Sequence, residues 1–170
     1  MKLTKNLLTG AVFSLATLFS ASSLAATAQV NWVNPDNYRD LEPGHSDSKT
    51  NFQKRFFKSL EKHIQKLAKE NLPPNYTLAV AVYDVDLSGS LNMGSSYAGM
   101  KMMRMVGEDQ PPAIELGYIV VDENNKEVLK GAKFLKDKNF RWRRKQSKEF
   151  FHEKKLIEKW FNKELSKIDS

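Results

Sequence analysis

The chain of 170 residues contains no cysteine and only three histidines. The absence of thiols excludes thiol catalysis, disulfide bonds, cysteine-based zinc sites and lipid attachment at a cysteine. Glycine is also scarce, with 8 residues, and none of them belongs to a Gly-rich phosphate loop. The fold must therefore be stabilised by packing alone.

Long hydrophobic runs are confined to the beginning of the chain. Lys2 and Lys5 precede an uncharged stretch from Asn6 to Leu24, which is the pattern of an export signal. The sequence Ala26-Thr27-Ala28 has the A-x-A form and predicts cleavage after Ala28, with Ala25 as the other candidate. No later stretch is long and apolar enough to span a bilayer. We therefore expect a signal peptide at residues 1–28 and one domain at residues 29–170.

Acidic residues are sparse in the last third of the chain, which is therefore strongly basic. Residues 126–170 carry 15 Lys and Arg against 7 Asp and Glu, whereas the whole chain has a net charge of +7. Such a region fits an anionic partner: a lipid headgroup, an acidic glycan or an acidic protein surface, with nucleic acid less expected outside the cytoplasm. The candidate contact residues are Arg141, Trp142, Arg143, Arg144 and Lys145. The alternative is a solvated connector whose aromatic residues anchor it to the core.

The periodicity of apolar residues predicts both strands and helices. The expected strands are 30–32, 76–87, 100–106, 113–122 and 128–135, and the expected helices run from about 50 to 72 and from 148 to about 168. Asp47, Ser48 or Thr50 would cap the first helix, and Pro73-Pro74 would end it. We predict an α+β fold: a two-layer sandwich in which a mostly antiparallel sheet carries two amphipathic helices on one face.

The first half of a calcium-binding motif lies at the end of the predicted central strand. Asp84, Asp86, Ser88 and Gly89 match the first half of an EF-hand loop, but Ser95 stands where a bidentate Glu is needed. A weak calcium site is therefore one hypothesis. In the other hypothesis, the two carboxylates lie at the end of the strand, accept N–H bonds from the loop that follows, and pair with Arg104.

Every methionine except the initiator lies in one short region. These residues are Met93, Met100, Met102, Met103 and Met105. Clustered thioethers suit Cu(I), so a copper site is one interpretation. The other is a strand whose methionines fill gaps in the core.

Carboxylates could also serve a hydrolase, which is a third alternative. General acid–base catalysis would require Asp84, Asp86 and Asp122 to converge on one substrate. The sequence places no second group beside Asp122, so no catalytic residue is assigned.

Several stretches along the chain resemble one known family. The matching stretches are Trp32 with Asn34-Pro35, Tyr38 and Asp40, Leu67-Ala68, Leu72-Pro73, Tyr76-Thr77-Leu78, Asp84 to Gly89, Arg104, Pro111-Pro112 with Ile114, Asp122, Gly131, and Glu158 to Phe161. Together they resemble the domain family of unknown function DUF3016, secreted proteins of Gram-negative bacteria. The residues that we regard as its structural motif are Trp32, Asp84, Asp86, Gly89, Arg104 and Trp160.

The resemblance implies one whole, exported domain, and it carries over no activity, cofactor or catalytic residue. From the signal peptide we expect a periplasmic location. The chain departs from the family at Ser88, where Ala is frequent, which argues against a metal role for that position. We therefore expect a non-enzymatic binding or envelope-associated accessory protein without a cofactor. Metal binding and hydrolysis remain the alternatives.

Overall fold

The computed structural model describes residues 25–44, 47–96, 99–107, 109–137, 140 and 148–168. Its elements are β1 (Thr27–Trp32), a short 3-10 helix (Pro35–Asn37), α1 (Lys49–Asn71), β2 (Thr77–Asp86), β3 (Ser90–Ser96), β4 (Gly99–Met105), β5 (Ala113–Val121), β6 (Glu127–Lys136), α2 (Phe151–Glu164) and a terminal 3-10 turn (Leu165–Lys167). The uncharged stretch of the predicted signal peptide and the basic run 141–145 lie outside the described residues.

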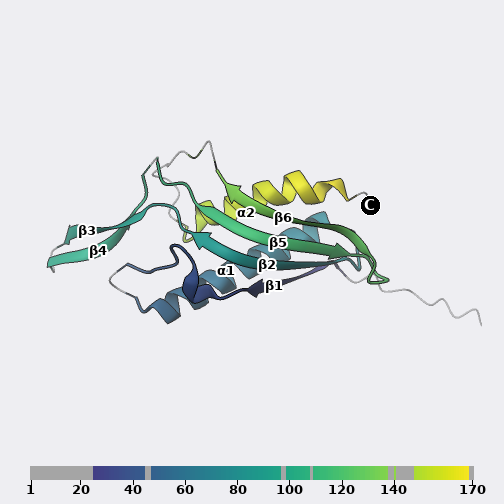
Figure 1. Ribbon diagram of the computed structural model, residues 1–170, viewed down its shortest axis with the longest axis horizontal. Helices are drawn as coiled ribbons and strands as arrows, with labels where there is room; N and C mark the ends of the chain where they lie inside the picture. Colours follow the sequence, from purple (N-terminus) through teal and green to yellow (C-terminus); the bar gives the residue numbers. More distant parts are fainter. Residues whose placement is uncertain are drawn as a thin grey trace, which may run out of the picture.

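The main sheet has four strands in the order β1-β2-β5-β6 (Figure 1). β1 runs parallel to β2, and the β2–β5 and β5–β6 pairs are antiparallel. The strand predicted to be central, β2, has a neighbour on each side, and the predicted β5–β6 hairpin is present. The α+β fold with a mostly antiparallel sheet is confirmed.

Helix α1 begins at the position that its capping chemistry indicates. The Ser48 hydroxyl accepts the main-chain N–H of Asn51 at 3.2 Å, which satisfies one of the free donors of the first turn. The helix ends at Asn71, just before Pro73, which lacks the N–H that helix continuation requires. Its buried residues recur every three or four positions, as expected for one apolar stripe: Phe56, Leu60, Ile64, Leu67 and Ala68.

One core lies between the sheet and the two helices. Alternate residues of β2 and β5 are buried, including the predicted face of β5: Ile114, Leu116, Tyr118 and Val120. Leu156, Ile157, Trp160 and Phe161 of α2 join the same cluster as the stripe of α1. Both helices therefore pack on one face of the sheet, as predicted.

The hairpin β3–β4 forms a separate two-stranded sheet that extends away from the main sheet (Figure 1). Sequence periodicity predicts β4 but not β3, which is rich in Gly and Ser. The interpretation of its methionines as core filling is wrong, because all five side chains are 37–69 % exposed.

Among the described residues, no helix is sufficiently long and apolar to cross a membrane.

Candidate functional site

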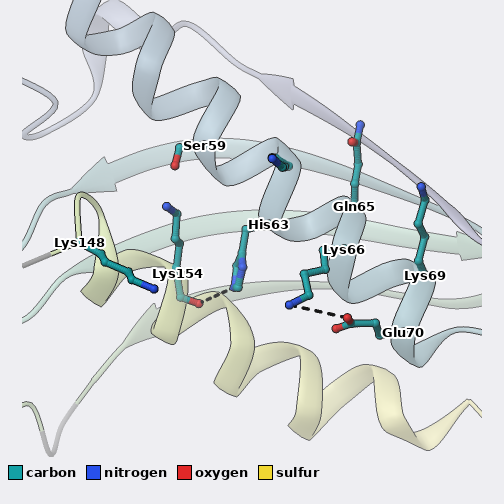
Figure 2. A pocket seen from close by; sticks show the side chains of 9 residues that line it. Ser59, His63, Gln65, Lys66, Lys69, Glu70, Lys148 and Lys154 are labelled. Atoms are coloured by element: carbon teal, nitrogen blue, oxygen red, sulfur yellow. Dashed lines mark hydrogen bonds and ion pairs between the residues drawn. The ribbon is translucent and has the colours of Figure 1, made fainter. Parts of the chain in front are cut away.

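A groove of about 830 Å³ lies between α1 and the beginning of α2 (Figure 2). It is lined by Ser59, Lys62, His63, Gln65, Lys66, Lys69 and Glu70 of α1, and by Lys148 and Lys154 from the region of α2. Five lysines and one glutamate thus line one hollow, and the side chain of Lys69 points away from α2 (Figure 2). This arrangement concentrates positive charge where two segments distant in sequence meet.

The lysine ammonium groups of the groove are mostly not neutralised. Lys66 lies 3.7 Å from Glu70, one turn further along α1, and the Nζ of Lys154 donates to the main-chain oxygen of Glu149 at 3.3 Å. Within the described part of the chain, Lys62, Lys69 and Lys148 form no ion pair. Among the described residues, three of these lysines therefore lack an anionic partner and two are weakly engaged.

His63 connects the two walls of the groove. Its Nε2 lies 3.1 Å from the main-chain oxygen of Lys154, so Nε2 carries the proton and donates it to that carbonyl (Figure 2). Burial lowers the pKa of His63 below its ordinary value of 6.5, while this hydrogen bond opposes the shift. The imidazole is consequently neutral at neutral pH and acts as a structural link.

The predicted calcium ligands are directed to partners within the protein. One Asp84 oxygen accepts the main-chain N–H of Arg39 at 2.7 Å, and the other lies 3.0 Å from the Arg39 guanidinium. Asp86 lies 3.3 Å from the same guanidinium. Calcium binding here would have to displace Arg39 from both carboxylates. Among the described residues, no three His, Asp or Glu side chains are grouped to hold a metal ion.

Arg104 was predicted to pair with Asp84 and Asp86, and this prediction is wrong. Its guanidinium instead binds both oxygens of Asp40, each at 2.7 Å, and donates to the main-chain oxygens of Glu42 and Gly89. The planar fork of Arg suits such a two-bond carboxylate contact. Because Asp40 forms a parallel bridge with Asp86, this contact ties the base of the β3–β4 hairpin to the end of β2.

Ser88, the third candidate ligand, contacts a residue that sequence reasoning missed. Both its main-chain N–H and its hydroxyl donate to one oxygen of Glu153, at 2.8 and 2.9 Å. Glu153 is only 3 % exposed and lies in the first turn of α2. A carboxylate is well placed there, since the first turn of a helix leaves N–H groups free and favours negative charge.

The carboxylates proposed for hydrolysis do not converge. Asp122 accepts the main-chain N–H groups of Asn124 and Lys126 in the turn that follows β5. Asp86 pairs with Ala113 at the other end of the same strand. Nine residues of β5 separate the two ends, about 30 Å of extended chain, so the prediction of one carboxylate cleft is wrong.

The remaining motif residues have structural positions in the core and the turns. The Trp32 indole donates to Glu61 at 2.7 Å and stacks on Phe57. Trp160 packs edge-on against Tyr118. Gly89 has a φ of +80° and would bring a Cβ within 2.4 Å of the Met105 oxygen, so only glycine fits.

The groove itself was not predicted from the sequence. No functional role was predicted for the lysines of α1, and the basic contact surface was placed at Arg141 to Lys145, outside the described residues. A usable signal did exist. Lys62, Lys66 and Lys69 recur at the spacing that places residues on one helix face.

Fold and groove together define a small α+β domain with a basic cleft between its two helices. The chain belongs to the family described as Protein of unknown function (DUF3016), whose model matches residues 26–163. No curated protein matches the chain, and no solved structure matches it.

Proposed function

We propose that this protein is a non-enzymatic binding domain that holds an extended polyanion in the groove between α1 and α2. The observation that carries the proposal is the set of five lysines around one hollow, opposed by a single glutamate. Like charges gathered on one surface repel each other, and a bound anion relieves that repulsion.

The spacing of the lysines favours a repeating anion over a single small one. Lys62, Lys66 and Lys69 span seven residues of helix, which corresponds to about 10 Å along its axis. Lysine is a flexible point charge that does not require bidentate geometry. Such a row suits the spaced sulfates or carboxylates of an acidic glycan, bound with modest specificity and strong dependence on salt.

The basic third of the chain contributes to the same surface. Lys148 and Lys154 belong to it and line the groove. Lys145, the last residue of the basic run, precedes Lys148 by three positions in the sequence. We therefore infer that Arg141, Arg143 and Arg144 add to the affinity for the polyanion.

We further infer that the protein is exported to the periplasm, with cleavage after Ala25 rather than Ala28. Cleavage after Ala28 would cut inside β1 and remove Ala26 and Ala28, which are 1 % and 7 % exposed. Ala25 with Ser23 also supplies small residues at the two positions that signal peptidase reads. The intact mass of the protein recovered from the periplasm should equal that of a chain beginning at Ala26. A mass that corresponds to a chain beginning at Gln29 would refute this assignment.

The groove is tested by retention on immobilised heparin, used as a polyanion probe. We expect Lys62→Gln with Lys66→Gln and Lys69→Gln to elute at clearly lower salt than the unmodified protein. The matched control replaces Lys101, Lys126 and Lys136, which do not line the groove, by Gln. Both variants lose three charges, so a difference between them reports the site rather than net charge.

Two outcomes would contradict the proposal. One is that the groove and control variants elute at the same salt concentration. The other is that the native protein is retained no more strongly than the groove variant. Equal melting temperatures of the variants would establish that folding is unaffected. The variant that combines Arg141→Ala, Arg143→Ala and Arg144→Ala should elute at a salt concentration between those of the native protein and the groove variant.

A further inference from the structure

The β3–β4 hairpin holds five methionines in water. Met93, Met100, Met102, Met103 and Met105 are each at least 37 % exposed, and they make up most of the exposed large hydrophobic side chains in the described part of the chain. None of them contributes to the core. An apolar group of this size that folding does not use suggests a role in binding.

The strand register divides the methionines between two faces. Met93 lies directly opposite Met102, and Met100 precedes Met102 by two positions on β4, so these three share one face. Met103 and Met105 lie on the other face, together with Lys101. One face thus carries three thioethers, and the other carries two beside a cation.

The three thioethers on the first face are within reach of one another. Directly opposed residues of antiparallel strands have Cβ atoms about 4.5–5.5 Å apart. Residues two apart on one strand are separated by about 6.8 Å. Methionine has three rotatable side-chain bonds, so its sulfur atoms can close these gaps around one ion.

The surroundings of this face favour a soft monovalent cation. Within the hairpin, register places only Leu91, Ser95 and Arg104 beside the three methionines, so the described hairpin strands themselves supply no carboxylate or imidazole to hold a hard dication. Arg104 would repel a cation, but both oxygens of Asp40 neutralise its charge. Thioethers are soft ligands and select Cu(I).

We propose that Met93, Met100 and Met102 form a three-thioether site for one Cu(I) ion on the exposed face of the hairpin. The site binds the reduced ion as such and involves no change of oxidation state. It is separate from the lysine groove in residues and in ligand chemistry, so either proposal can fail alone.

Ag⁺, which is soft like Cu(I) and stable in air, is the probe for the experiment. The protein carries ¹³C-labelled methionine methyl groups, and their NMR signals are followed during titration. We expect saturation at one equivalent, with the signals of Met93, Met100 and Met102 shifted and those of Met103 and Met105 nearly unchanged. Zn²⁺ and Ca²⁺ should shift none of the five.

Matched substitutions within the hairpin separate the two faces. Met102→Leu keeps size and apolarity but removes a sulfur, and it should weaken Ag⁺ binding at least tenfold. Met103→Leu, on the opposite face, should leave the affinity within twofold. The amide signals of Asn92 and Arg104 confirm that the hairpin is intact in each variant. Absence of Ag⁺ binding, equal shifts of all five methyl groups, or equal loss in the two variants would overturn the proposal.

Discussion

Glu153 is the residue whose environment departs most from what its chemistry suggests. A carboxylate that is almost fully buried must be satisfied by hydrogen bonds, and one of its oxygens receives two from Ser88. This contact joins the first turn of α2 to the chain that follows β2. The contact therefore holds these two elements together.

Glu153→Ala should lower the free energy of unfolding by about 1–3 kcal/mol, because it leaves the buried N–H of Ser88 without a partner. Ser88→Ala removes only the hydroxyl contact and should cost about 1 kcal/mol. Urea denaturation measures both. Glu158→Ala serves as the control on the same helix, since Glu158 forms a surface pair with Lys155 that should contribute less than about 1 kcal/mol. Equal costs for Glu153→Ala and Glu158→Ala would contradict this account.

The carboxylate partners of Arg39 and of Arg104 illustrate what sequence can predict at the scale of single residues. Asp84 and Asp86 were predicted to accept N–H bonds from the following loop and to pair with Arg104, whereas the residue that contacts both carboxylates is Arg39. The identity of the arginine was not predictable, because the chain has six arginines and only the path of the chain after β1 brings Arg39 to this position. Ser88 and Glu153, 65 positions apart, could not have been paired for the same reason.

At the scale of elements, the joint between α1 and α2 depends on a neutral histidine. His63 of α1 donates to the main-chain oxygen of Lys154 in α2, and burial lowers its pKa. Protonation would place a cation in a half-buried site among lysines. The stability of this joint should therefore depend on pH.

The direction of that dependence follows from the lowered pKa. Between the pKa in the folded protein and 6.5, the unfolded chain binds more protons than the folded one, so stability rises with pH in this window and falls as the pH drops below 6.5. His63→Gln keeps a donor for the carbonyl but does not titrate. We expect its urea midpoint to change less between about pH 5 and about pH 7.5 than that of the native protein. His152, whose pKa is also lowered by burial, should maintain a residual slope, and an unchanged slope in His63→Gln would contradict this assignment.

Elements that face the core were predictable, whereas β3, which lies outside the core, was not. The apolar stripe of α1, the buried face of β5 and the β5–β6 hairpin all follow from periodicity, because burial against one core imposes it. β3 was missed because a hairpin outside the core needs no alternation, and Gly94 and Ser95 indicate a loop in isolation. The methionines are exposed for the same reason, because the hairpin lies outside the core.

At the scale of the whole molecule, charge and topology together create the groove. The sequence shows that the last third of the chain is basic, but Lys62, Lys66 and Lys69 of α1 also line the groove. These residues and Lys148 meet only because both helices cover the same face of the sheet. A groove formed by two segments about 80 positions apart requires the fold, so the sequence indicated the basic charge of the last third of the chain but not where the groove lies.

The most direct test of the polyanion-binding account is NMR mapping of a heparin oligosaccharide titrated into the ¹⁵N-labelled protein. The account predicts that shifted amides gather at residues 59–70 and 148–154, and that raising the salt concentration reverses the shifts. The amides of β6 and of the β3–β4 hairpin should remain unchanged. Shifts centred on the sheet or the hairpin, or no salt-reversible shifts at all, would contradict the account.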